Sequence, residues 1–476
     1  MGGFSLVASR TLEQVFFPFA AVIGLALGSM LLLGDQSKPQ VKDSNLVDQK
    51  LRPEKAYMLF TFNRPMDRAS IEKGFTINPP VMGKFSWSGK RFAFTPKTPL
   101  AYGQKYDLQM MGKDQTGKVM IPFKSTITTP VRKFFYVGTE GSEKDHLFAV
   151  NFESKQQQQL TPNNQVVLKF SPHPNGSKAY YFAFRPEDKT SLLEQDYQSL
   201  YEVNFAQSDK ASSQFIADFK QWSNIDFALS PDGNNLLIQR LKKDSTPEFG
   251  LWLLNTNKSN LDWQPFYYSQ LSGAVSFTPD SGALAGIDSG GLVIAPLPTE
   301  QKKKPQPEFI TGYAQFFDFS ADGQSALVSR YDAAFRSELV ILRTSGQIQK
   351  IITTEATLSR AQFDPLGQYL YVILLFEPKQ VEGRQHYQLV RFDLKTGKQK
   401  ELWNQMDRNL IAFDLSPDGK YILAEHTKSV PLKSTLRRSL ERVGGSELDS
   451  TVVLLDRDGK LIPGFAPRPG TAPQWN

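Results

Sequence analysis

The chain has 476 residues, of which 40% are hydrophobic and 22% are charged, so it is long enough for two or three well-filled globular domains. It has no cysteine, which excludes disulfides, thiolate metal sites, a Cys nucleophile and an acylated-Cys anchor. The net charge of +7 is too diffuse for a nucleic-acid binder. Many Phe, Gly and Pro residues favour short strands and turns, and predict an all-β fold.

The first apolar segment covers residues 15–34 and carries no charge. Twenty residues at roughly 1.5 Å each would cross the ~30 Å core of a bilayer. We therefore expect a transmembrane helix at 15–34, with an N-terminal tail at 1–14 and a polar stalk linker at 35–51. A cleaved signal peptide and a buried soluble helix are the alternatives. A signal core is usually shorter and no A-x-A site follows, while a soluble helix is rarely so apolar on every face.

Charges around this segment give only weak evidence on its orientation. Four basic residues follow it and one precedes it, which favours a cytoplasmic C-terminal body. Long downstream domains, however, cross membranes largely regardless of such charges.

Short alternating stretches mark residues 52–130 as a β-sandwich. In GKFSWS at 83–88 and RFAFTP at 91–96 the aromatic rings recur at every second position, which places them on one face for a second sheet to cover. In FNRPMD at 62–67, Pro65 fixes the backbone of a turn and Asp67 caps the segment after it.

Several motifs in this region resemble the bacterial Ig-like domains of surface-layer and other exported proteins. They are FNRPMD, FTINPP at 75–80, FTPKTPLAYGQKY at 94–106 and DQTG at 114–117. The resemblance implies a spacer or adhesive module. It also implies that the globular part lies outside the cytoplasm, in a periplasm or lumen, against the weak charge evidence.

A turn cassette repeats through the rest of the chain. It appears as FSPHPNG (170–176), LSPDG (229–233), FTPDSG (277–282), FSADG (319–323), FDPLG (363–367) and LSPDG (415–419). The intervals of 42 to 57 residues match the roughly forty to fifty residues of a four-stranded propeller blade.

The cassette residues are predicted to be structural. Pro presets φ, Asp accepts backbone N–H bonds, and Gly takes the positive φ of a tight hairpin. The repeat-turn residues are Asn175, Asp232, Asp280, Asp322 and Asp418. Leu366 replaces the acidic residue once, so we do not interpret these carboxylates as catalytic acids.

The cassettes resemble the WD40-like repeats of TolB-type propellers, and we expect a β-propeller over residues 131–476. Three strand-like runs near 133–161 lack a first strand, and the chain ends in TAPQWN, which looks like the start of another cassette. The C-terminal strand is therefore predicted to close the ring. Seven blades are expected, with six or eight left open because the 57-residue interval could hold an extra hairpin.

The sequence offers no catalytic constellation. His146, His173, His386 and His426 are far apart and form no HExxH motif, and there is no GxSxG elbow, Walker A or GxGxxG motif. We expect no catalytic residue, no metal site and no cofactor.

Residues 429–445 interrupt the repeat with an amphipathic helical pattern. Its basic face holds Lys433, Arg437, Arg438 and Arg442. These four residues are candidates for binding an acidic partner or anionic lipid. Alternatively, the leucines pack on the propeller and the basic face is only solvated.

Taken together, the sequence predicts a non-catalytic, single-pass membrane-anchored scaffold outside the cytoplasm, whose propeller binds a protein of a membrane complex or envelope. It predicts no nucleic-acid partner. The alternative is a carbohydrate- or cell-wall-binding protein with hydrolase or lyase activity in the propeller channel. A ring of Trp, His and carboxylates at the channel mouth would favour the alternative. An apolar or uniformly charged rim would favour the scaffold.

Overall fold

The computed structural model describes residues 37–46, 58–98, 100–189, 191, 193–205, 211–243, 248–258, 260–298, 306–377, 386–405, 407–428 and 449–476. These residues form two compact units. The first comprises the described residues before 99 together with 105–128, and the second comprises 100–104 and 129–476. Both are built almost entirely from antiparallel strands, so the all-β prediction is confirmed.

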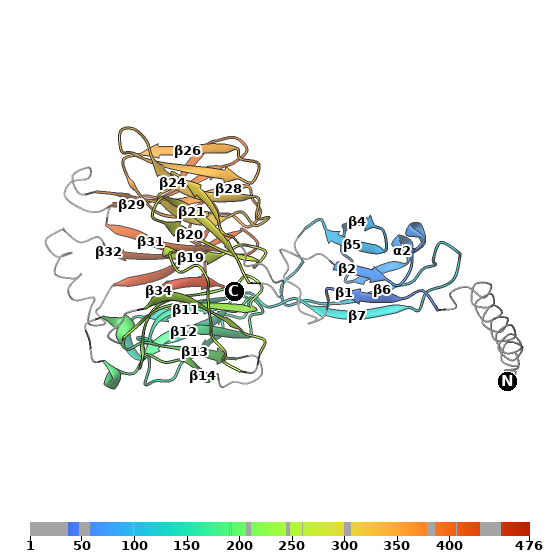
Figure 1. Ribbon diagram of the computed structural model, residues 1–476, viewed down its shortest axis with the longest axis horizontal. Coiled ribbons are helices and arrows are strands. Elements are labelled where there is room, and N and C mark those ends of the chain that lie inside the picture. The colour runs from blue at the N-terminus through green and yellow to red at the C-terminus, as the bar shows by residue number, and fades with distance from the viewer. Residues whose placement is uncertain are drawn as a thin grey trace, which may run out of the picture. The chain divides into compact units, whose positions relative to one another are not determined.

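Among its described residues, the first unit contains two sheets and one short helix (Figure 1). One sheet has the order β1-β2-β5-β4, with bounds Val41–Ser44, Met58–Phe62, Arg91–Pro96 and Gly83–Ser88. The other has the order β3-β6-β7, with bounds Phe75–Asn78, Lys105–Met110 and Phe123–Thr128. Helix α2 covers Arg68–Gly74.

Aromatic rings fill the space between these sheets. Phe92 of β5 is fully buried and its ring centroid lies 5.8 Å from that of Phe60 and 5.4 Å from that of Phe75. The period-two pattern of β5 is therefore covered as predicted. Strand β4 is the edge of its sheet, so its ring at Phe85 stays 38% exposed and the predicted cover is only partial there.

Helix α2 was not predicted from the sequence, although its cap was. Asp67 is the N-cap and its Oδ1 accepts a 2.7 Å hydrogen bond from the backbone N–H of Ser70. The cap satisfies one of the free N–H groups at the helix start.

The second unit contains five four-stranded sheets and one seven-stranded sheet among its described residues. The four-stranded sheets are β11–β14 (Val166–Pro172, Lys178–Phe184, Ser199–Asn204, Ser212–Ala217), β15–β18 (Trp222–Leu229, Asn235–Lys242, Phe249–Asn255, Gln264–Pro265), β19–β22 (Ser272–Phe277, Ala283–Asp288, Gly291–Pro296, Glu308–Thr311), β23–β26 (Gln315–Phe319, Ser325–Tyr331, Ser337–Arg343, Ile348–Thr354) and β27–β30 (Thr357–Phe363, Tyr369–Phe376, His386–Asp393, Gln399–Trp403).

The seven-stranded sheet joins the two ends of this unit, in the order β10-β9-β8-β34-β33-β32-β31. Its strands are β8 (Lys133–Gly138), β9 (Leu147–Asn151), β10 (Gln157–Gln159), β31 (Arg408–Leu415), β32 (Tyr421–Lys428), β33 (Ser450–Asp456) and β34 (Arg468–Trp475). The start of β34 pairs with β33 and the rest pairs with β8.

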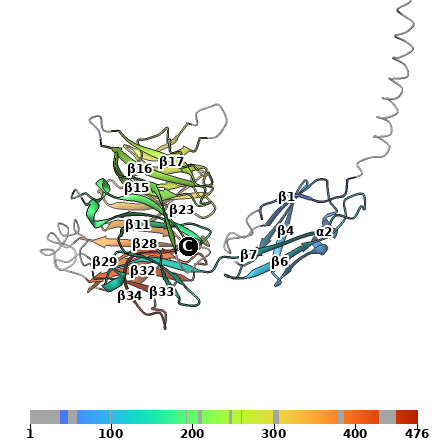
Figure 2. The ribbon, with the colours of Figure 1, turned by 90° about the horizontal axis from the view of Figure 1, so that it is seen from below.

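Contacts between neighbouring sheets arrange the second unit as a ring. The first strand of one sheet contacts the first strand of the next, as β15 does with β19 and β23 with β27, so these strands lie innermost. Strand β34 contacts β11 in the same way and thereby closes the ring. Consecutive antiparallel sheets around a central channel define a β-propeller (Figure 1, Figure 2).

The closure is reinforced by the last two residues. Trp475 is 6% exposed and packs against Phe134 and Phe152, with ring centroids 6.0 and 5.5 Å away. The side chain of Asn476 accepts a 2.9 Å hydrogen bond from the N–H of Lys133, whose carbonyl accepts one from the N–H of Asn476. A strand from each end of the unit therefore meets in one sheet, which leaves no long unpaired edge there.

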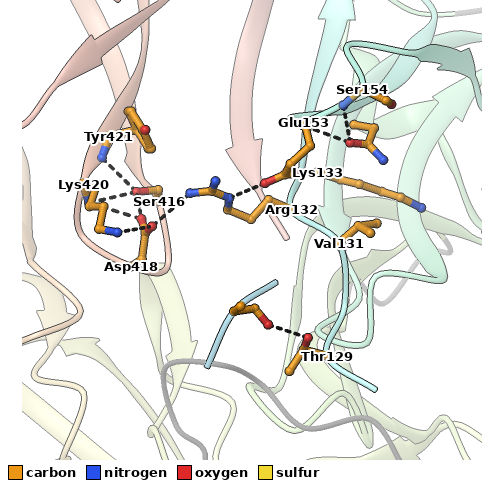
Figure 3. Close-up of polar contacts among 12 residues, drawn as sticks. Thr129, Val131, Arg132, Lys133, Glu153, Ser154, Ser416, Asp418, Lys420 and Tyr421 are labelled. Atoms are coloured by element: carbon orange, nitrogen blue, oxygen red, sulfur yellow. Dashed lines mark hydrogen bonds and ion pairs between the residues drawn. The ribbon is translucent and has the colours of Figure 1, made fainter. Parts of the chain in front are cut away.

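A guanidinium joins the two parts of the seven-stranded sheet that come from the start and the end of the second unit, as Figure 3 shows. Arg132 donates from Nη1 to Asp418 Oδ2 at 2.9 Å and from Nε to Glu153 Oε1 at 2.8 Å. Its Cζ lies 4.4 Å from the ring centroid of Phe152 and 5.6 Å from that of Tyr421. The Arg132 side chain is only 15% exposed, so both its ion pairs and its packing on the aromatic rings stabilise the ring closure.

The propeller has two opposite ends, because successive strands are antiparallel. The turn face carries the connections between the first and second strands of the sheets, which include residues 230–234, 278–282, 320–324, 364–368 and 416–420. The loop face carries the connections between the second and third strands, which include residues 185–198, 289–290 and 332–336.

The predicted localisation needs correction. Across the part of the chain that the structure describes, no helix is long and apolar enough to cross a bilayer, and α2 has only seven residues. At about 1.5 Å per residue such a helix cannot span an apolar core of about 30 Å. The predicted helix at 15–34 lies outside the described residues. A single-pass membrane protein with an extracytoplasmic body is therefore not supported.

Candidate functional site

The cassette residues lie in the hairpins of the turn face and bond to their own turns. Asp232 Oδ1 accepts from Ser230 Oγ at 2.5 Å and from the N–H of Asn234 at 2.9 Å. The same pair of bonds recurs at Asp280, Asp322 and Asp418, and Asn175 Oδ1 accepts from the N–H of Ser177. These groups are spread around the ring and do not converge on one site.

In the cassette with Leu366, a different carboxylate accepts the backbone N–H bonds of the turn. Asp364 occupies the first turn position, where four of the other turns have Ser or Thr and the turn of Asn175 has His173, and it is 2% exposed. Its Oδ1 accepts from the N–H groups of Gln368 and Tyr369. Burial raises the pKa of this carboxyl, while its backbone donors lower it.

The other predicted candidates stay apart or lie outside the described residues. Lys433, Arg437, Arg438 and Arg442 belong to the segment 429–448, which is outside the described residues. The histidines occupy separate places, since His173 bonds to the carbonyl of Gly233 in a turn and His426 stacks on Trp403. Among described residues, no group of three or more His, Asp or Glu side chains could hold a metal ion.

The channel brings together polar residues that were not predicted from the sequence. Asp318, Gln362 and Asp414 lie on innermost strands β23, β27 and β31, each two residues before its turn. Asp318 Oδ2 accepts from the N–H of Phe363 at 2.9 Å, in the next sheet. Asp414 Oδ2 accepts from the N–H of Trp475 at 2.7 Å, on β34 of the same seven-stranded sheet. The carboxylates thus tie neighbouring innermost strands together.

Gln362 lies between the two aspartates in this series. Its Nε2 donates to Asp414 Oδ1 at 3.5 Å, while its buried Oε1 has no hydrogen-bond partner among the described residues. A buried carbonyl oxygen without a donor is costly, which makes this atom a natural acceptor for a ligand.

Arg360 is the cation of this region. It lies two residues before Gln362 on β27, so both side chains belong to the same face of the strand. Arg360 is exposed, its Cζ lies 5.5 Å from the ring centroid of Phe413, and its charge lowers the pKa of both aspartates. β-Bulges at Phe316/Asp318 and at Leu358/Arg360 re-aim the side chains at this point.

A pocket of about 610 Å³ connects Asp318, Arg360 and Gln362 with the loop face. It is lined by Ile287, Ala314, Gln315, Phe316, Phe317, Asp318, Ser359, Arg360, Ala361 and Gln362. Its size lies within the range of small-molecule sites, roughly 300–1,000 Å³. Ile287 lies near the end of one strand and Ala314 precedes another at the loop face, so the pocket runs from that face toward the channel.

Asp318 is the carboxyl-bearing residue of the pocket lining, and the pKa of its carboxyl is strongly shifted. Burial raises its pKa to about 7, and the neighbouring negative charge of Asp414 adds to the rise. The backbone N–H groups of Phe363 and Phe319 and the charge of Arg360 oppose it. Burial likewise raises the pKa of Asp414. Asp318 can therefore exchange a proton near neutral pH, a property common at functional sites.

The loop face also carries exposed aromatic side chains. Phe335 is 87% exposed at the tip of the turn that follows β24, and Tyr331 at the end of β24 is 61% exposed. Phe335 has a φ of +57°, which is unusual for a bulky residue. Asp332 holds this turn, since its Oδ1 accepts from the N–H groups of Ala334 and Arg336. On the turn face, the exposed hydrophobic residue of the 364–368 connection is instead aliphatic, Leu366.

The six tryptophans are engaged outside the pocket. Three of them surround one guanidinium, with Arg240 Cζ lying 4.2, 4.4 and 5.7 Å from the ring centroids of Trp222, Trp252 and Trp263. The others are Trp87 in the first unit, Trp403 against His426, and Trp475 in the closure. The pocket lining thus has one carboxylate, that of Asp318, but neither Trp nor His.

A signal for the channel residues was present in the sequence. The cassettes at 319–323 and 415–419 are each preceded by Asp, giving DFSADG and DLSPDG. A comparison of the turn cassettes does not include these aspartates, because they lie upstream of the cassettes in the innermost strands. The β-bulges, which decide the direction of these side chains, leave no such pattern.

Solved structures with a similar fold share little sequence with this chain. TolB from Acinetobacter baumannii is 12% identical, covering 84% of this chain and 82% of its own, with a TM-score of 0.38. A Bacteroides uniformis protein provisionally assigned as a 6-phosphogluconolactonase is 14% identical, covering 73% and 99%, with a TM-score of 0.44. Prolyl oligopeptidase B from Galerina marginata is 12% identical, covering 63% and 44%, with a TM-score of 0.43. The propeller assignment rests on strand order and not on these likenesses.

Comparison by sequence identifies one region. No curated protein matches the chain. Residues 35–129 match the family model described as a bacterial Ig-like domain. The two antiparallel sheets of the first unit fit that family, so the resemblance seen in the sequence is confirmed. The chain therefore combines a bacterial Ig-like domain at residues 35–129 with a β-propeller.

Proposed function

We propose that this protein is a non-catalytic interaction scaffold whose propeller binds a protein partner at its loop face. The observation that carries the proposal is the pair of exposed aromatic residues at Tyr331 and Phe335. Aromatic side chains provide most of the binding energy at many protein interfaces. A rigid turn that holds Phe335 in the left-handed region presents the ring before any partner arrives.

The propeller suits this role because it combines a stable ring with variable connections. We further propose that the ring has seven blades. In this count the seven-stranded sheet contributes two blades, one of β31, β32 and β33 with the start of β34, and one of the rest of β34 with β8, β9 and β10. The strand order supports this division, because β34 pairs with β33 through Thr451↔Pro469 and with β8 through Gly470↔Gly138.

The interaction proposal is tested by affinity purification of the tagged full-length protein from its native bacterium. A Tyr331→Ala/Phe335→Ala variant should lose a partner that the wild-type protein retains. Leu366→Ala is the matched control, because Leu366 is 45% exposed on the turn face. Equal recovery of every protein from all three samples would refute binding through the loop-face aromatics.

A second function is favoured by one observation, the carboxyl of Asp318 with its pKa raised to about 7 in a pocket. Two carboxyl groups in different protonation states are the arrangement that most glycoside hydrolases use. The absence of Trp from the pocket lining weighs against a sugar, which usually packs on such rings. Release of reducing ends from purified cell-wall polysaccharide, lost in Asp318→Asn and Asp414→Asn, would favour this second function.

A further inference from the structure

The pocket at the loop face has charges of both signs at different depths. Arg360 is closer to the mouth, since it follows Thr357 at the start of β27, whereas Gln362 and Asp318 lie nearer the end of their strands. Asp414 lies beyond Gln362, which donates to it. A molecule entering from the loop face would meet a guanidinium first and acceptor oxygens afterwards.

We propose that this pocket binds a small zwitterion that carries an ammonium and a carboxylate, either a free amino acid or a short peptide. The carboxylate pairs with Arg360, whose planar guanidinium matches it with two parallel hydrogen bonds. The ammonium lies deeper and donates to Gln362 Oε1 and to the carboxylate of Asp318. This inference goes beyond the scaffold proposal and does not depend on it.

Each ligand group satisfies an atom that the protein leaves available. Gln362 Oε1 is buried without a partner among the described residues. The carboxyl of Asp318 accepts from the N–H of Phe363 at Oδ2 and also bonds to the N–H of Phe319, which leaves further lone pairs of the carboxylate to accept from the ligand. Arg360 is exposed in the pocket and stacks toward Phe413. The apolar lining at Ile287 and Phe316 offers contact for a side chain.

Charge balance gives the site a dependence on pH. The groups that act on Asp318 are Asp414, Arg360 and the backbone N–H groups of Phe363 and Phe319. A bound ammonium favours ionised Asp318 and therefore displaces its proton when the carboxyl is neutral. Binding should tighten as the pH rises from 6 to 8 and should release a proton.

The test is ligand-observed NMR on the full-length protein with each of the twenty common amino acids and with trialanine. The strongest binder is then titrated by calorimetry at pH 6, 7 and 8. The N-acetyl and carboxamide forms of that ligand should each bind at least ten-fold more weakly, because each removes one charge. Binding of trialanine but of no amino acid would assign the site to peptides, and the reverse to free amino acids.

Variants locate the binding within the pocket. Arg360→Gln and Asp318→Asn should each weaken binding at least ten-fold, and Asp318→Asn should abolish the release of a proton. Arg343→Gln is the matched control, because Arg343 is an exposed arginine lining a separate pocket of about 710 Å³ at the turn face. A cooperative thermal unfolding transition in each variant shows that it folds. A screen without any binder would overturn the proposal. So would N-acetyl and carboxamide forms that bind as tightly as the unmodified ligand.

Discussion

Arg132 and Asp418 are 286 residues apart in the sequence, yet Nη1 of the first lies 2.9 Å from Oδ2 of the second. Asp418 belongs to the turn after β31 and Arg132 directly precedes β8, so this ion pair joins the two ends of the ring. Both side chains are mostly buried, at 15% and 6% exposure. Asp418 therefore accepts hydrogen bonds within its own turn and also from Arg132 at the ring closure.

Removing this guanidinium should destabilise the propeller. We expect Arg132→Ala to lower the free energy of unfolding by about 2–4 kcal/mol, because it leaves the buried carboxylate of Asp418 with only the exposed Lys420, 3.8 Å away, as a cation. Urea unfolding followed by tryptophan fluorescence measures the loss. Arg336→Ala, which removes the more exposed pair with Asp332, should cost less than about 1 kcal/mol. Equal losses in the two variants would show that the closure does not depend on Arg132.

Trp475 should contribute to closure mainly through packing. Trp475→Ala removes a 6%-exposed ring from Phe134 and Phe152, and a loss of about 3–5 kcal/mol is expected. Hydrogen exchange should show faster exchange in β8 and β34 than in β15 and β16. Phe335→Ala, at an 87%-exposed position, should change stability by less than about 0.5 kcal/mol. Unchanged exchange in β8 would contradict this role for the Trp475 ring.

Asp318 should make stability fall as the pH rises toward 7. Its folded-state pKa of about 7 exceeds the ordinary 3.8, so the folded protein binds this proton more tightly than the unfolded chain between these values. The contribution to stability is fully present below pH 4 and is lost as the pH rises through 7. Asp318→Asn should therefore be more stable than the wild type at pH 8 and similar to it near pH 4, as measured by thermal unfolding.

Asp322 provides a control of opposite sign. The hydrogen bond from Ser320 Oγ, followed by the N–H of Gln324, lowers the pKa of its carboxyl. Its stabilising contribution is present above the ordinary pKa and is lost as the pH falls below it. Asp322→Asn should thus lose stability at pH 8, where Asp318→Asn gains it. The same sign for both variants would contradict the assigned shifts.

Asp364 should matter more than Leu366 in the one turn that lacks the usual aspartate. Asp364→Ala leaves the N–H groups of Gln368 and Tyr369 without their acceptor, at a cost of about 1–3 kcal/mol. Leu366→Ala changes a 45%-exposed side chain and should cost less than about 0.5 kcal/mol. Chemical denaturation of the two variants gives the comparison, and a larger loss at Leu366 would contradict it.

Local patterns made much of the fold predictable. The alternating rings of β5 and the motifs around Asp67 identified the Ig-like domain, which the family comparison confirmed. The repeated turns located the hairpins of the propeller, because positive φ at Gly233 and Gly323 requires such residues. Helix α2 was missed, since its seven residues are too few to show a helical period.

The candidate site was much less predictable. Asp318, Arg360 and Gln362 meet only because consecutive innermost strands lie side by side and carry bulges, and neither property is local to the sequence. Exposure of Phe335 likewise depends on the tertiary structure, since its sequence neighbourhood does not distinguish it from the buried phenylalanines. For the apolar segment at 15–34 the sequence predicted too much, because composition alone led to a predicted localisation that the structure does not support.

The central claim is that the loop face binds a protein partner, and site-specific photocrosslinking tests it most directly. A photoreactive amino acid replaces Phe335 on the loop face or Leu366 on the turn face of the full-length protein in its native host cell. We predict that the Phe335 position crosslinks to one defined protein and that the Leu366 position does not. The Phe335 crosslink should disappear when an excess of the unlabelled protein competes for the partner. Equal crosslinking from both faces, or none from Phe335, would contradict the claim.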